Sequence, residues 1–282
     1  MPFVNAKAEP STDIHYIDVG AGKPVVLIHG WPLSQSMWEH QINALVDAGF
    51  RCIAYDRRGF GHSGKPSGGY DYDTFASDLN DLMVALDLDR LITELDLHDV
   101  TLVGFSMGGG EVARYIGTYG TERIAKAMLL GAVTPFLLQT ADNPDGAPQA
   151  LFDGMIAAVK HDRLAFLDGF FPNFFNSDAN YPGVAADLIP FSKFIAWGAS
   201  PIGTQQCVKA FGTTDFRADL AKFDIPTLIV HGELDRIVPI AISGAKAAIK
   251  GSKYEVVAGA PHGFAATHAE QLNALMIAFL KS

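Results

Sequence analysis

Val100-Thr-Leu-Val-Gly-Phe-Ser-Met-Gly-Gly-Gly-Glu-Val-Ala-Arg114 is the stretch that decides the fold of this chain. Its first residues are apolar or β-branched, as in a buried strand, and its last residues follow a helical pattern. Between them, a single serine stands among glycines. A strand, a tight glycine turn and a helix in this order predict a sharp corner of an α/β fold, with the serine hydroxyl raised at the end of the strand.

Short apolar runs of the same kind recur along the chain, mostly separated by helical patterns. Their hydrophobicity is continuous rather than alternating, which is what a parallel strand needs when helices cover both of its faces. The runs therefore predict an α/β fold with a mostly parallel, doubly wound sheet. The six predicted strands are Pro24–Ile28, Arg51–Tyr55, Val100–Val103, Ala127–Leu130, Pro226–Val230 and Tyr254–Val257.

The rhythm of the sequence changes between residues 134 and 220. Strand-like runs disappear there, and Phe, Gly, Pro and Asn crowd into segments such as Phe170-Phe-Pro-Asn-Phe-Phe175. We expect a mostly helical cap over the sheet, inserted before the strand predicted at Pro226–Val230. Residues 1–133 and 221–282 then form the core domain, and residues 134–220 form the cap.

Composition limits the classes of partner. The chain has 282 residues, 49% of them hydrophobic, and its 21 basic and 31 acidic residues give a net charge of −10. That charge repels nucleic acid and anionic membranes. Cys52 and Cys207 both lie in apolar sequence, so we expect buried free thiols and a reducing compartment. Since neither a signal peptide nor a membrane span is visible, the expected location is the cytoplasm.

One local repeat interrupts a smooth helical pattern. The segment Leu82-Met-Val-Ala-Leu-Asp-Leu88 is echoed nine residues later by Leu91-Ile-Thr-Glu-Leu-Asp-Leu97. Nine residues rotate a helix by about two and a half turns, so the two apolar stripes would face opposite ways. We therefore expect a break, or two short helices, near residues 87–89.

The serine lies in a G-x-S-x-G pentapeptide, Gly104-Phe-Ser-Met-Gly108. Alone this pattern is common by chance, but a strand before it and a helix after it give it mechanical meaning, with Ser106 as a nucleophile. Glycines before a helix can also bind phosphate. That alternative fails here, because neither a Gly-Lys-Ser/Thr segment nor G-x-G-x-x-G spacing is present.

A serine nucleophile needs a base, and the base needs an orienting acid. In this kind of fold they follow the serine in the order acid, then histidine, each after a strand. Asp235 follows the strand predicted at Pro226–Val230, and His262 follows the last predicted strand. Glu233 competes for the acid role but lies nearer to its strand and is expected to cap the turn. The histidines that we interpret as scaffold residues are His29, His231 and His268.

The third requirement is an oxyanion hole, normally made by two main-chain N–H groups. One donor is expected from Met107, the residue after the nucleophile. The other is expected from the loop His29-Gly-Trp-Pro-Leu-Ser34. Trp31 is the predicted donor, because Gly30 allows the turn and Pro32 has no N–H.

Several segments together resemble one family, the cofactor-free bacterial haloperoxidases or perhydrolases. These are α/β-hydrolases close to the aryl esterases and the γ-lactamases, and the similarity runs almost end to end. The echo between residues 76 and 100 departs from the family, which has a single apolar run there. The segments that carry the resemblance are His29-Gly-Trp-Pro-Leu-Ser, Tyr55-Asp-Arg-Arg-Gly-Phe-Gly-His-Ser63, Tyr70-Asp-Tyr-Asp-Thr-Phe-Ala76, Gly104-Phe-Ser-Met-Gly-Gly-Gly-Glu, Asp142-Asn-Pro-Asp-Gly-Ala-Pro148 and Ala260-Pro-His-Gly-Phe.

The resemblance implies an α/β-hydrolase fold and a serine carboxylesterase acting on small aryl esters. Its acyl-enzyme is attacked by water or by hydrogen peroxide, and the resulting peracid oxidises halide. No metal, haem or other cofactor is implied. The implied partners are a small ester, a carboxylic acid and hydrogen peroxide, with a homo-oligomer left open. The resemblance also implies a small apolar pocket walled by Val133, Phe166, Phe170, Phe211 and Val238.

Three other functions stay open. The same triad could cleave a γ-lactam or a lactone, because the resemblance extends to γ-lactamases. Dehalogenases and epoxide hydrolases of this fold use an aspartate as nucleophile, and Ser106 argues against them. From another functional class, a hydrolase fold can serve as a ligand receptor with a vestigial triad. An intact set of serine, acid and histidine argues against that role.

Overall fold

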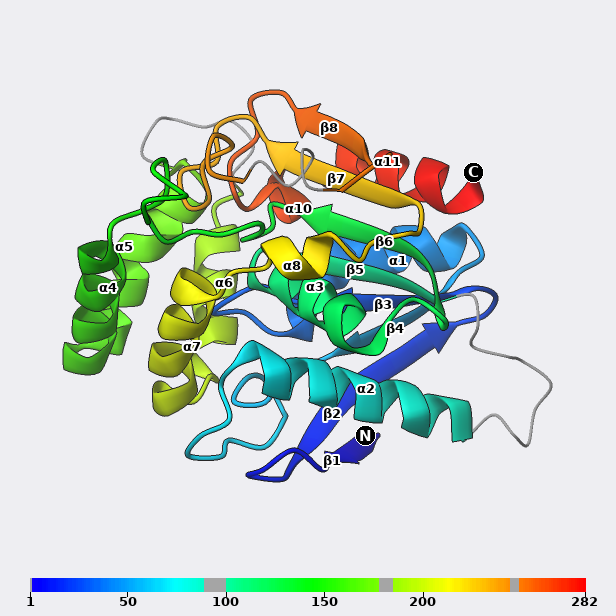
Figure 1. The fold of residues 1–282 in the computed structure, drawn as a ribbon, viewed down its shortest axis with the longest axis horizontal. Helices are drawn as coiled ribbons and strands as arrows, with labels where there is room; N and C mark the ends of the chain where they lie inside the picture. Colours follow the sequence, from blue (N-terminus) through cyan, green and yellow to red (C-terminus); the bar gives the residue numbers. More distant parts are fainter. Residues whose placement is uncertain (1, 89–99, 178–184, 244–248) are drawn as a thin grey trace.

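A computed structural model of the chain describes residues 2–88, 100–177, 185–243 and 249–282. Its centre is an eight-stranded sheet with the order β1-β2-β4-β3-β5-β6-β7-β8 (Figure 1). The strands from β4 to β8 in this order are parallel. All six strands predicted from continuous hydrophobicity are present. They are β3 (Pro24–Ile28), β4 (Arg51–Tyr55), β5 (Val100–Phe105), β6 (Ile124–Leu130), β7 (Thr227–Gly232) and β8 (Lys253–Val257).

Two further strands at one edge of the sheet were not predicted. These are β1 (Phe3–Ala6) and β2 (Thr12–Gly20), and each pairs antiparallel with its neighbours. Charged residues such as Asp13 and Asp18 interrupt the hydrophobicity of β2, whose residues are partly exposed. A criterion based on continuous apolar runs therefore misses a partly exposed strand of this kind.

Helices cover both faces of the sheet (Figure 1). On one face α1 (Glu39–Asp47), which follows the short 3₁₀ helix η1 (Gln35–Trp38), contacts α10 (Phe264–Thr267) and α11 (Ala269–Lys281). On the other face α3 (Met107–Tyr119) contacts α2 (Tyr72–Leu88) and α8 (Arg217–Leu220). This layering is the doubly wound arrangement that the sequence predicted.

The predicted break of the helical pattern falls at the edge of the described chain. Helix α2 is described as far as Leu88. The second apolar run of the echo, Leu91 to Leu97, lies outside the described residues.

Four helices gather at one end of the sheet, between β6 and β7 in the chain (Figure 1). Helix α4 packs against α7 and α5, and α5 packs against α6. The shorter α8 lies within residues 134–220 but packs on α3 of the core layer. The helical character expected for this segment is present, and its treatment as a separate cap domain stays a proposal. The four helices are α4 (Gln149–His161), α5 (Arg163–Phe174), α6 (Leu188–Trp197) and α7 (Pro201–Thr213).

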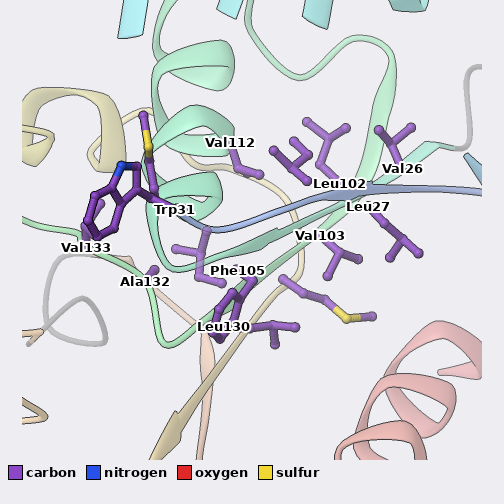
Figure 2. Close-up of a cluster of buried hydrophobic side chains, with 14 of the residues drawn as sticks. Val26, Leu27, Trp31, Leu102, Val103, Phe105, Val112, Leu130, Ala132 and Val133 are labelled. Carbon is purple, nitrogen blue, oxygen red and sulfur yellow. The ribbon is translucent and has the colours of Figure 1, made fainter. Parts of the chain in front are cut away.

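The core follows the central strands. Every residue of β3, β4 and β5 is buried. Figure 2 shows apolar side chains of β3 and β5 on both sides of the sheet, with Trp31 and Val133 at the margin of the cluster. Cys52 and Cys207 are both buried and unpaired, as expected. In the part of the chain that the structure describes, no helix combines the length and apolarity needed to cross a bilayer.

Candidate active site

The predicted nucleophile lies at a strained corner of the backbone. Ser106 stands between the end of β5 and the start of α3, with φ 53° and ψ −117°, a conformation that a non-glycine residue rarely adopts. The neighbouring glycines make the corner possible. A Cβ on Gly104 would lie 2.3 Å from the carbonyl oxygen of Gly108, and one on Gly108 would lie 2.3 Å from that of Ile28. Sterics therefore explain the G-x-S-x-G spacing.

The structure brings the predicted base to this serine across 156 residues of chain. His262 follows β8, and its Nε2 lies 2.9 Å from Ser106 Oγ. The imidazole is fully buried, and its centroid lies 5.0 Å from the ring centroids of both Phe105 and Phe174. These aromatic contacts fix the plane of the ring, so Nε2 is held toward the hydroxyl.

The predicted acid lies on the other side of that imidazole. Asp235 Oδ2 is 2.6 Å from His262 Nδ1, while Oδ1 accepts main-chain N–H bonds from Ile237 and Val238 at 2.9 and 2.8 Å. Burial alone would raise the pKa of Asp235. The charge of His262 and hydrogen bonds from His231 and His262 outweigh burial and hold this pKa below its ordinary value. The carboxylate is therefore ionised at neutral pH.

Glu233, the other candidate for the acid role, bonds to the main chain of another loop. Its side chain is exposed and accepts the main-chain N–H of Gly259 at 2.7 Å. This bond links the loop after β7 to the loop after β8. Glu233 thus braces the two loops that carry the acid and the base.

The three histidines expected to be scaffold residues each bond to the framework. His231 Nε2 donates to the Val238 carbonyl at 2.8 Å and also lies 3.3 Å from Asp235 Oδ2. His29 Nδ1 donates to the Gly30 carbonyl at 2.9 Å. His268 Nδ1 lies 2.9 Å from the hydroxyl of Thr267. Burial lowers the pKa of both His29 and His268. His29 is therefore a neutral, structural imidazole at pH 7.

The two predicted oxyanion donors border the same cavity as Ser106. Met107 is the first residue of α3, and the first amides of a helix have no acceptor within the helix. The Trp31 side chain is anchored by a 2.9 Å bond from its indole N–H to the Thr204 carbonyl. A cis peptide bond joins Trp31 to Pro32. Trp31 and Met107 thus lie beside the nucleophile, and the indole hydrogen bond holds the Trp31 side chain in place.

The cavity beside Ser106 has a volume of about 170 Å³. Four of the five predicted wall residues line it, namely Val133, Phe170, Phe211 and Val238. Phe166 stands apart: its ring packs against Trp31 and Phe170 with centroid distances of 6.0 and 5.9 Å, and it lines a neighbouring outer groove.

Other wall residues were not identified from the sequence. They come from α4, from the segment before it and from the loop after Asp235. Phe152 and Met155 form an apolar i, i+3 pair on α4, which indicated a buried helix face. This pattern alone does not show whether the face borders a cavity or the core. The additional wall residues are Leu137, Ala147, Leu151, Phe152, Met155, Arg236, Ile237, Pro239 and Ile242.

This arrangement has a hydroxyl, a buried imidazole and an ionised carboxylate in the order that acyl transfer needs, and the two residues predicted to supply oxyanion donors lie beside them. Among the residues described, no three His, Cys, Asp or Glu side chains form a group able to hold a metal ion.

Comparison with known proteins agrees with the geometry. Residues 23–269 match the family model described as alpha/beta hydrolase fold. A non-heme chloroperoxidase from Kitasatospora aureofaciens is 48% identical, with 90% of each chain covered. A bifunctional esterase/perhydrolase from Acinetobacter calcoaceticus is 36% identical over the full length of both chains.

Solved structures place the chain in the same group. The crystal structure of a bromoperoxidase from Bacillus anthracis superposes with a TM-score of 0.92 at 50% identity, covering 100% of this chain and 99% of that one. The chain belongs to the α/β-hydrolase fold family and, within it, to the serine hydrolases related to the non-heme haloperoxidases and esterase/perhydrolases.

Proposed function

We propose that this protein is a serine carboxylesterase for small aryl esters that also carries out perhydrolysis. The observation that supports this most is the chain of contacts from Ser106 Oγ to His262 at 2.9 Å and from His262 to Asp235 at 2.6 Å. Ser106 at the end of this chain lines a small apolar cavity. The relatives named as esterase/perhydrolase and chloroperoxidase support the same pair of activities.

Acylation begins at Ser106. Its Oγ attacks the ester carbonyl while His262 Nε2 accepts the hydroxyl proton, and the charge of Asp235 stabilises the imidazolium that forms. The main-chain N–H groups of Trp31 and Met107 bind the oxyanion of the tetrahedral intermediate. His262 then gives the proton to the leaving alcohol or phenol, and the acyl group remains on Ser106 as an ester.

Deacylation decides which product appears. Water attacking the acyl-enzyme gives a carboxylic acid, whereas hydrogen peroxide gives a peracid, and in both cases His262 accepts the proton of the nucleophile. The peracid then leaves and oxidises halide in solution. One peracid, one halide ion and one proton yield one carboxylic acid and one hypohalous acid, so the halide needs no site of its own.

The size and lining of the cavity support a small acyl group. A volume of about 170 Å³ holds a short acyl chain or one aromatic ring. We assign Val133, Phe170, Phe211 and Val238 to the wall that contacts substrate, and Phe166 to the support of Trp31 and Phe170. Residues 134–220 would then act as a cap domain that closes the cavity over the core.

A substrate panel tests the proposed function. Phenyl acetate and p-nitrophenyl acetate should be hydrolysed, and adding hydrogen peroxide should produce peracetic acid at the expense of acetate. Since the same triad could open a cyclic substrate, the panel should include a γ-lactam and a γ-lactone. Faster turnover of either would replace the aryl esterase proposal with a lactamase or lactonase.

A second experiment in the same panel tests for catalysis itself. A sulfonyl fluoride should label Ser106 and stop turnover. If no substrate were turned over and the serine stayed unlabelled, the chain would be a ligand receptor on a hydrolase fold.

Acyl-chain preference should follow the wall formed by α4. Met155→Ala removes part of this wall. The kcat/KM for p-nitrophenyl octanoate, divided by that for p-nitrophenyl acetate, should then rise about tenfold. Room for one or two further methylenes in an apolar pocket changes kcat/KM by about this factor. The matched control is Ile202→Ala on α7, whose side chain is 44% exposed. An unchanged ratio in Met155→Ala would remove α4 from the acyl site.

A further inference from the structure

A group of buried polar side chains lies beside the oxyanion loop, and the proposed mechanism does not use it. Tyr55 and Arg57 come from the end of β4 and the loop after it, Glu111 comes from α3, and His29 comes from the loop after β3. Each is at most 1% exposed. Burying a charge is costly unless it is paired, so each charged side chain here is expected to have a partner of opposite charge.

Glu111 is paired through both carboxylate oxygens. Its Oε2 accepts from Arg57 Nε at 2.6 Å, and its Oε1 accepts from the hydroxyl of Tyr55. Burial raises the pKa of Glu111, and Arg57 and Tyr55 partly offset that effect. The guanidinium thus has one fixed partner on α3.

The same arginine also holds the oxyanion loop. Arg57 Nη2 donates to the main-chain carbonyl of His29 at 2.9 Å, and Arg57 N donates to His29 Nε2 at 3.0 Å. His29 can accept this second bond because its Nδ1 carries the proton that is donated to Gly30. Arg57 therefore grips both the main chain and the side chain of His29.

These bonds connect the segments that carry the two oxyanion donors. His29 lies two residues before Trp31, and Glu111 lies one helical turn after Met107. The path Glu111–Arg57–His29 therefore links the start of α3 to the oxyanion loop through directional hydrogen bonds. The pairing of β3 with β5 and the close approach of Gly108 to the Ile28 carbonyl also hold these segments together, and the hydrogen bonds of Arg57 add a directional link to them.

We propose that Glu111 and Arg57 are positioning residues that set the spacing of the Trp31 and Met107 N–H groups. This inference rests on the proposed function, since it needs a reaction that passes through an oxyanion. Neither residue contacts the reacting atoms. Their effect should therefore appear in stabilisation of the transition state and not in binding of the ground state.

The chain offers a matched control a few residues away. Arg58, next to Arg57, forms a bidentate pair with Asp78 through two 2.6 Å bonds, and this pair is buried as well. Its remaining bonds reach the carbonyls of Pro10 and Ala8, at the N-terminal edge of the protein. Breaking this pair shows how the loss of a buried ion pair affects stability and kcat when the oxyanion loop is not altered.

The experiment compares Glu111→Gln with Asp78→Asn. Wild-type protein is first shown to hydrolyse p-nitrophenyl acetate and to react with a sulfonyl fluoride at Ser106, which tests the proposed function separately. Glu111→Gln should then lower kcat by about 10- to 100-fold with little change in KM, because loss of a whole oxyanion donor costs about 10²- to 10³-fold. Asp78→Asn should change the melting temperature to a similar extent but leave kcat within twofold.

A binding measurement separates positioning from general damage. Glu111→Gln should weaken a phenylboronic acid, which forms a tetrahedral adduct on serine, by the same factor as kcat, and should bind benzoate as the wild type does. Equal losses of kcat in the two variants, or an unchanged kcat in Glu111→Gln, would overturn the proposal. If Glu111→Gln does not fold, Tyr55→Phe is the second test, because it removes the other hydrogen bond to Glu111. A lower kcat at constant KM supports the positioning role, and unchanged kinetics reject it.

Discussion

Ser106→Ala should abolish ester hydrolysis, perhydrolysis and halide oxidation together, each by a factor on the order of 10⁵ to 10⁶. In the proposed mechanism all three activities begin with the same attack by Ser106 Oγ, and the hypohalous acid is formed only after a peracid has been released. The substitution removes one 2.9 Å contact to His262, so the fold should persist. Release of p-nitrophenol, formation of peracetic acid and bromination of a dye in the presence of peroxide measure the three rates.

A serine elsewhere provides the control. Ser192 is buried in α6, where its hydroxyl donates to the Leu188 carbonyl at 2.8 Å, so Ser192→Ala should keep all three activities. Halide oxidation that survives in Ser106→Ala while ester hydrolysis disappears would contradict a shared acyl-enzyme. It would point to a separate peroxide site.

How much of the fold the sequence predicts depends on where each strand lies. A central strand such as β3 is covered on both faces, so Pro24–Ile28 is apolar throughout and its bounds were predicted correctly. Strand β2 lies second from the edge of the sheet and contains both buried and exposed residues, and it was missed. A strand is apolar throughout only where helices cover both of its faces, and a strand near the edge of the sheet is partly exposed.

The candidate site likewise has a part that the sequence predicts and a part that it does not. Chain order and strand ends were enough to select Ser106, Asp235 and His262, because in this fold each of them follows a strand that the sequence makes visible. The cavity wall from α4 was not predicted, because an apolar helix face looks alike whether it meets a core or a cavity.

Glu111 ends one of the segments that carry the family resemblance, and the sequence alone predicts no role for it. Its partners Arg57 and Tyr55 lie 54 and 56 residues away in the chain. A charge placed among glycines and valine at the start of a helix was the available signal, because a buried charge requires a partner. Only the three-dimensional pairing identifies which partner it has.

Asp235→Asn should lower kcat by about 10³- to 10⁴-fold with KM nearly unchanged, by analogy with other triads. The reason lies in the hydrogen bonds of the loop. Oδ1 accepts two main-chain N–H bonds, from Ile237 and Val238, so the amide oxygen of an asparagine must take that position. Its NH₂ group then faces His262 Nδ1 and makes that nitrogen an acceptor. The proton moves to Nε2, which can no longer accept the proton of Ser106.

Glu233→Gln is the matched control, because it makes the same chemical change two residues away. Glu233 bonds to the N–H of Gly259, and the amide oxygen of a glutamine can keep that bond, so kcat should stay within about twofold. Steady-state kinetics of both variants on p-nitrophenyl acetate decide the assignment. A large loss in Glu233→Gln together with an active Asp235→Asn would transfer the acid role to Glu233. The opposite pattern follows if His262 takes its orientation from Asp235, because the carboxylate of Asp235 lies 2.6 Å from its Nδ1.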